Sequence, residues 1–169
     1  MRIESKDKVW TRNLSDDLER YGREAGPFPI AGIMTAQLRS AKTGWLHYEG
    51  LGLSGGTGEY GSSAILNSIK IGAMAPAGGQ ESKGVWADAK VLLTPQAIAS
   101  LGQVNHFALD NSGHDYFAVR RFWIELQLAD GRKASSQIST AAFTQPPTWP
   151  YGAGIKVPMN ENIQVDIAF

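Results

Sequence analysis

The sequence predicts an all-β fold, an antiparallel sandwich or barrel of about eight strands with one short helix. Three observations lead to this prediction. Apolar and polar residues alternate in several short segments, which is typical of strands with one buried face. The 169 residues include 19 glycines and 8 prolines, enough to supply turns between many short strands. Hydrophobic residues make up 43% of the chain, which suffices for one packed core and one domain.

The alternating segments begin after residue 27. The first would place a row of apolar or small residues on one face: Ile30, Gly32, Met34, Ala36 and Leu38. Further alternating runs predict strands over residues 45–53, 65–71, 85–93 and 104–109.

A hairpin is predicted in the second half of the chain. Asp130-Gly131 follows an alternating run and is a favoured two-residue turn, because both residue types accept positive φ. Residues 132–140 would return as a polar strand, and residues 163–169 would form the last strand. We expect the shared core of the two sheets to include Phe122, Ile124, Leu126, Ile163, Val165 and Ile167.

The single expected helix interrupts the strands at residues 94–102. Thr94 is a suitable N-cap, Pro95 suits the first helical position, and Gly102 lies just past the end. Residues 1–26 differ from the rest, because they hold 12 of the 32 charged residues. We therefore divide the chain into an N-terminal arm, residues 1–26, and a β domain, residues 27–169.

The composition argues against several classes of function. Lysine plus arginine equals aspartate plus glutamate at 16 each, and this balance argues against a dedicated nucleic-acid binder, which needs a basic surplus. The absence of cysteine excludes disulfides, thiolate metal sites and thiol nucleophiles. No apolar run reaches the length of a membrane span, and none follows the N-terminus as in a secretory signal.

Local motifs favour structural over catalytic interpretations. Residues 52–56 match the Gly-x-Ser-x-Gly nucleophile pattern, and residues 50–55 match a dinucleotide fingerprint, but no helix is predicted after either. The His106, Asp110, His114 and Asp115 group is explained equally well by a turn or a metal site. Residues 147–150 read as a stiff loop rather than a ligand for an aromatic groove.

The remaining acidic and aromatic residues give no local active-site pattern. Acidic residues of the β domain, Glu49 among them, are scattered, and we expect them at the surface. Trp86 and Trp123 fall on the less apolar face of their strands, which is expected if other subunits cover that face. No catalytic, cofactor-binding or metal-binding residue is predicted, and the chain is not expected to be an enzyme.

The C-terminal segment, residues 155–169, carries a family resemblance. A proline, a short polar turn containing asparagine and an alternating terminal strand resemble the last strand of virion proteins of tailless, membrane-containing phages. In size and strand layout the chain is similar to the small single jelly-roll major capsid protein of such icosahedral phages of thermophilic bacteria. The resemblance implies a virion structural protein that assembles in the host cytoplasm with a second capsid protein, over an internal membrane, without a cofactor.

The resemblance and the composition also suggest how subunits associate. We expect a homo-oligomer, with a dimer that exchanges a terminal segment as the leading form. The arm is the first candidate for exchange, because its short helix would leave four apolar residues in need of a surface: Trp10, Leu14, Leu18 and Tyr21. The C-terminal strand is the second candidate. Two other functions stay open, a carbohydrate-binding or adhesin-like sandwich and a small β-barrel enzyme using residues 106–115.

Overall fold

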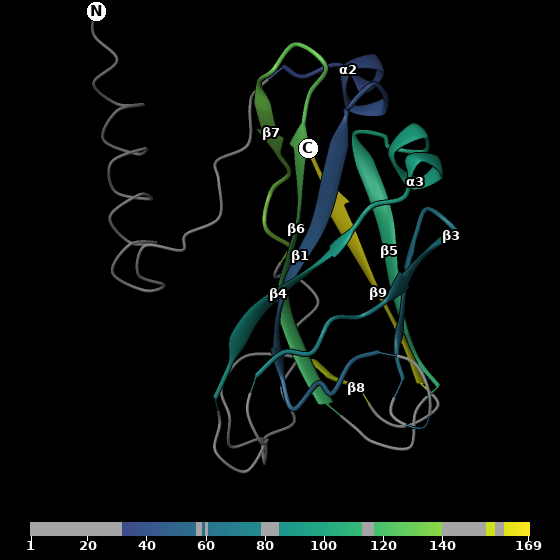
Figure 1. Ribbon diagram of the computed structural model, residues 1–169, viewed down its shortest axis with the longest axis vertical. Coiled ribbons are helices and arrows are strands. Elements are labelled where there is room, and N and C mark those ends of the chain that lie inside the picture. Colours follow the sequence, from purple (N-terminus) through teal and green to yellow (C-terminus); the bar gives the residue numbers. More distant parts are fainter. Residues whose placement is uncertain are drawn as a thin grey trace, which may run out of the picture.

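The computed structural model describes residues 32–56, 59, 61–78, 85–112, 117–139, 155–157 and 161–169. Over these residues the chain folds as an antiparallel β-sandwich, which confirms the predicted fold class (Figure 1). In chain order the elements are α2 (Thr35–Arg39), β1 (Thr43–Leu51), β2 (Ser63–Leu66), β3 (Ile69–Ala73), β4 (Ala87–Leu92), α3 (Pro95–Ala99), β5 (Val104–Asn111), β6 (Phe117–Gln127), β7 (Lys133–Ser135), β8 (Ile155–Val157) and β9 (Glu161–Ala168). No helix within these ranges is long and apolar enough to cross a membrane.

Two sheets form the layers of the sandwich. The first has the order β4-β1-β6-β7, and β8 pairs with the opposite end of β6. The second has the order β3-β2-β5-β9. Apart from the β2–β3 hairpin and the run β6–β7–β8, each successive strand lies in the opposite sheet. This alternation carries the chain repeatedly between the two layers of the sandwich. Helices α2 and α3 lie at one end of the sandwich (Figure 1).

The core lies between the two sheets and confirms the sequence prediction. Five of the six expected core residues are buried, and Ile163 is half-buried against the same cluster. Phe122 of β6 packs on Phe107 of β5 with ring centroids 4.9 Å apart, so the two sheets contact each other through aromatic side chains. Tyr48 of β1 also packs near Phe122, with ring centroids 6.4 Å apart.

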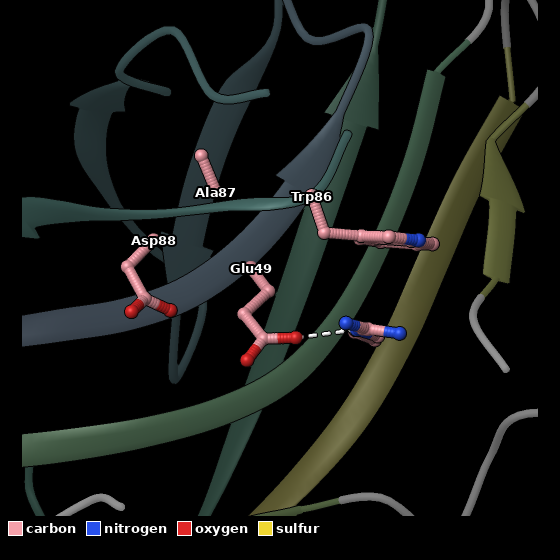
Figure 2. A pocket seen from close by; sticks show the side chains of 5 residues that line it. Glu49, Trp86, Ala87 and Asp88 are labelled. Atoms are coloured by element: carbon pink, nitrogen blue, oxygen red, sulfur yellow. Dashed lines mark hydrogen bonds and ion pairs between the residues drawn. The ribbon is translucent and has the colours of Figure 1, made fainter. Parts of the chain in front are cut away.

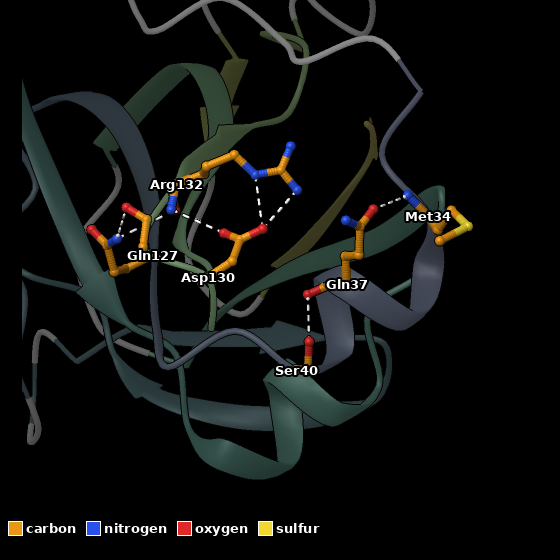
Figure 3. A network of polar contacts seen from close by, with 7 residues as sticks. Met34, Gln37, Ser40, Gln127, Asp130 and Arg132 are labelled. Atoms are coloured by element: carbon orange, nitrogen blue, oxygen red, sulfur yellow. Dashed lines mark hydrogen bonds and ion pairs between the residues drawn. The ribbon is translucent and has the colours of Figure 1, made fainter.

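The helix signal at Thr94 was correct. Thr94 caps α3, because its hydroxyl oxygen accepts a hydrogen bond from the Ala97 N–H at 3.2 Å. A turn also lies at Asp130-Gly131, but it is longer than the two residues predicted: the Leu128 N–H bonds to the Arg132 carbonyl at 2.8 Å, so residues 129–131 form the loop, and of the two predicted turn residues only Gly131 has a positive φ. Gly131 has φ of 90°, which only glycine adopts without strain, and its N–H bonds to the Leu128 carbonyl at 3.1 Å. Asp130 adds hydrogen bonds to the Arg132 backbone and guanidinium at this turn (Figure 3).

The strand predicted from Ile30 to Leu38 is wrong. The described part of that segment, from residue 32 onward, contains helix α2 instead, with Leu38 buried and Met34 exposed. The Gln37 side-chain oxygen accepts a hydrogen bond from the Met34 N–H at 2.9 Å, which satisfies a donor at the helix start (Figure 3). The apparent period of two depended on the small residues Gly32 and Ala36, neither of which favours a strand: Gly32 has a positive φ of 80°, and alanine favours a helix.

Two other boundaries also differ. Residues 65–71 form a hairpin rather than one strand, because Asn67 and Ser68 both have positive φ, 49° and 67°. The return strand expected over residues 132–140 is short, and β7 ends at Ser135. The proposed arm, residues 1–26, lies outside the described residues.

Candidate functional site

The outer face of the first sheet holds the most distinctive cluster of side chains. Its strands β4, β1 and β6 each contribute a tryptophan: Trp86 directly before β4, Trp45 on β1 and Trp123 on β6. Each indole lies near a cation. Lys90 lies 5.1 Å from the Trp45 ring centroid, Arg120 4.1 Å from Trp86, and Arg121 5.7 Å from Trp123. We call this surface, defined by Trp45, Trp86 and Trp123, the tryptophan face.

A buried ion-pair cluster lies within the tryptophan face. Glu49 is 7% exposed and accepts hydrogen bonds from both neighbouring arginines, from Arg120 Nε and Arg121 Nη1. Arg121 is 4% exposed, so this pair is shielded from water. The expectation that Glu49 lies at the surface is therefore wrong. The two guanidinium groups compensate for the hydration that the Glu49 carboxylate loses on burial.

A β-bulge brings both arginines to the same carboxylate. The β1–β6 register changes between His47, which is opposite Trp123, and Glu49, which is opposite Arg120. Strand β6 therefore holds one extra residue at this point, and Arg121 adopts a left-handed φ of 55°. A bulge bends the strand and redirects side chains. Without it, consecutive residues of β6 would point to opposite faces of the sheet.

A shallow pocket borders the cluster. It has a volume of about 140 Å³ and is lined by Glu49, Trp86, Ala87, Asp88 and Arg120 (Figure 2). Pockets for drug-sized ligands usually measure ~300–1,000 Å³. This pocket accommodates a few water molecules or the end of one side chain. Its charged and indole walls suit a contact with another protein surface.

His47 extends the cluster along β1. Its ring stacks on the Trp123 indole, with centroids 4.8 Å apart and planes 13° apart. Its Nε2 lies 4.0 Å from a Glu125 carboxylate oxygen. Burial lowers the pKa of His47 below its ordinary 6.5, the Glu125 carboxylate raises it, and the Lys90 ammonium lowers it further. Burial prevails, so the folded protein favours the neutral imidazole.

The lowered pKa of His47 predicts a pH dependence of stability. The unfolded chain binds a proton at His47 more readily than the folded protein does, so stability falls as pH drops below about 6.5. Replacing His47 with phenylalanine keeps a ring for stacking and removes the proton site. Thermal melts at pH 7 and pH 5.5 should show a smaller loss of Tm for H47F than for the wild type. Equal losses would contradict the shielded, neutral state of His47.

The motifs singled out in the sequence do not converge on a second site. Ser54 is exposed in the loop after β1, and no helix follows it in the described residues before β2. His106 pairs with Asp166 at 2.6 Å on the exposed side of β5 and β9. In the described ranges no three histidine, aspartate or glutamate side chains gather as metal ligands. His114, Asp115, residues 147–150 and the four arm residues Trp10, Leu14, Leu18 and Tyr21 lie outside those ranges.

Sequence reasoning found the outward tryptophans but not the ion-pair cluster. Trp86 and Trp123 were placed correctly on the face away from the core, although Trp123 is 5% exposed and therefore buried. The signal for the cluster was present in Arg120-Arg121, two adjacent charged residues within the otherwise apolar stretch of residues 117–124. Such a pair is consistent with a bulge, but its partner Glu49 is 71 residues away along the chain.

Comparison with known proteins found no family model, no curated protein and no solved structure that matches this chain.

Proposed function

We propose that this protein is a structural subunit that self-assembles, of the capsid type that its sequence resembles, and that it is not an enzyme. The tryptophan face carries the proposal. Tryptophan and arginine are the residue types most enriched at the energetic centres of protein interfaces. Here they lie on the outer side of one sheet. Trp123 and Arg121 are buried within the subunit, so the part open to a partner consists of Trp45 and Trp86, which are half-buried, and Leu92, which is 57% exposed. A solvent-facing sheet without a partner would normally carry a more polar surface.

The scaffold beneath this face also supports the proposal. The ion pairs of Glu49 and the ring contacts of Phe122 hold the outer face and the core in one arrangement. A shell subunit needs such rigidity, because the same contact must be repeated at every position in the assembly. The proposal includes a second capsid protein as partner, an icosahedral shell and a place in the virion over an internal membrane. These elements rest on the sequence resemblance.

The proposal includes an exchanged segment. In this exchange the arm, residues 1–26, crosses to a neighbouring subunit. The surface of that subunit covers the apolar residues of the arm, Trp10, Leu14, Leu18 and Tyr21. Light scattering on the full chain over ~10 µM to ~1 mM tests the association itself, and the proposal expects a mass that rises to at least twice that of the monomer. A chain starting at Pro27 should associate more weakly. A monomer at every concentration would refute self-assembly, whereas equal association of the shortened chain would refute only the role of the arm.

A carbohydrate-binding module is the alternative from a different class, and one observation bears on it. Sugar rings stack on an open indole face. On the tryptophan face, cations lie over Trp45 and Trp86, so at least one side of each ring is already in contact with the protein itself. Intrinsic tryptophan fluorescence should therefore change little when simple sugars are added. Saturable quenching by one sugar class would favour the alternative over assembly.

A further inference from the structure

Strand β4 is the edge of the first sheet, and its outward backbone groups can be assigned. The Leu93 N–H donates to the Gly44 carbonyl at 2.8 Å, in register with the β1–β4 ladder. In an antiparallel pair, hydrogen-bonded residues alternate with residues whose backbone groups point the other way. Residues 87, 89 and 91 therefore bond to β1, whereas residues 88, 90 and 92 direct their N–H and C=O groups to the opposite edge. No described strand pairs with that edge.

The side chains of β4 have a twofold pattern centred on Ala89. Asp88 and Lys90 flank Ala89 and are both exposed, and Trp86 and Leu92 flank that pair. All four lie on the outer side, and Ala89 faces the sandwich and packs against the core. If a second β4 ran antiparallel to the first about this centre, Asp88 would lie opposite Lys90 of the other copy. Trp86 would likewise lie opposite Leu92.

We propose that two copies of this chain pair edge to edge through β4, with a twofold axis at Ala89, to join their first sheets into one continuous sheet. This inference deepens the proposed function, on which it rests, by naming the partner and the surface. The pairing places two oppositely charged pairs, two Trp86–Leu92 contacts and about four central interchain hydrogen bonds along the seam. Opposite charges directly across two strands are stabilising, and like charges are destabilising.

The backbone and the charges together select one register. Only residues 86, 88, 90 and 92 direct their groups to the open edge, so the alignment moves in steps that keep even-numbered residues opposite one another. One step in one direction places Asp88 opposite its own copy. One step in the other direction places Lys90 opposite its own copy. The register centred on Ala89 is thus the neighbouring alignment that avoids like-charge contacts.

The same pairing also extends a row of charges that runs across each subunit. Asp88 lies directly opposite Glu49 in the β1–β4 ladder, and Arg120 lies opposite Glu49 on the other side. Adding Lys90 of a second copy beside Asp88 extends this row across four strands, as Arg120, Glu49, Asp88 and the second Lys90. In this row the two carboxylates lie between two cations. The pairing also covers Leu92, a large apolar residue of β4 that is 57% exposed.

The chain contains no cysteine, so one introduced thiol reports this register directly. In full-length A89C the two thiols lie across the twofold axis, and a non-hydrogen-bonded antiparallel pair has Cα atoms about 4.5 Å apart, within disulfide range. The matched control is A87C on the same strand and face, whose two thiols would be displaced by four residues, about 13 Å. Under mild oxidation A89C should give a disulfide-linked dimer in high yield, and A87C should remain monomeric on non-reducing gels.

Charge reversal gives a second, reversible measurement. D88K or K90D alone places like charges opposite each other twice, and each should weaken dimerisation at least tenfold in sedimentation experiments. The double variant D88K/K90D restores opposite pairs and should recover most of the wild-type affinity, and circular dichroism should confirm folding of all three. If the wild type associates but A89C does not cross-link and the reversals have no effect, the β4 interface is refuted and self-assembly stands. A wild type that stays monomeric at ~1 mM refutes both.

Discussion

Replacing Glu49 with glutamine should lower the free energy of unfolding by about 3–5 kcal/mol, because it removes the anion from two arginines while their charges remain. The larger part of this loss comes from Arg121, because its side chain is only 5% exposed and its Nη1 donates a hydrogen bond to Glu49. For a domain of this size the loss corresponds to a Tm lower by about 10 °C. Chemical and thermal denaturation of E49Q measures both quantities.

Two control variants distinguish the effect of losing the buried ion pair from the effect of losing an exposed one. Asp130 and Arg132 form an exposed pair at 2.8 Å, and D130N should leave the Tm almost unchanged because water screens that interaction. The double variant E49Q/R121M removes both buried charges and should regain part of the stability lost in E49Q. Equal Tm values for E49Q and D130N would contradict the shielded cluster beneath the tryptophan face.

Replacing Phe122 with alanine should cost about 3–5 kcal/mol of unfolding free energy, as is usual for a buried aromatic side chain. Phe122 is fully buried and contacts Phe107 of the opposite sheet, so its loss opens a cavity between the layers. Phe169 is the matched control, because it packs only partly buried against the same core. Urea denaturation should show F122A well below F169A in stability, and the reverse order would contradict the proposed centre of the sandwich.

The regular parts of the fold were predictable because each depends on local signals. The apolar residues Phe122, Ile124 and Leu126 occur at every second position, which indicates a strand with one buried face. This pattern is visible in the sequence whichever segment of the chain forms the opposite sheet. The α3 signals at Thr94 and Pro95 act within one helical turn. The period of two was misleading around Ala36, because alanine favours a helix over a strand, and Leu38 is buried from helix α2.

The functional surface was harder to predict because it depends on pairing between distant strands. Nothing near Glu49 in sequence shows that two arginines more than 70 residues away would cover it. The charges of Asp88 and Lys90 read as ordinary surface residues until the strand order places β4 at a sheet edge. Edge position and backbone direction are properties of the assembled sheet. The pairing role proposed for Asp88 and Lys90 depends on both, so the local sequence does not reveal it.

Composition analysis of purified particles tests the structural-subunit proposal most directly. Particles from cultures that produce this protein would be banded on a density gradient, and their proteins quantified by mass spectrometry. The proposal expects this chain among the most abundant proteins of an icosahedral particle, at many copies each, together with a second capsid protein. Recovery of the chain only in the particle-free fraction would contradict the assignment.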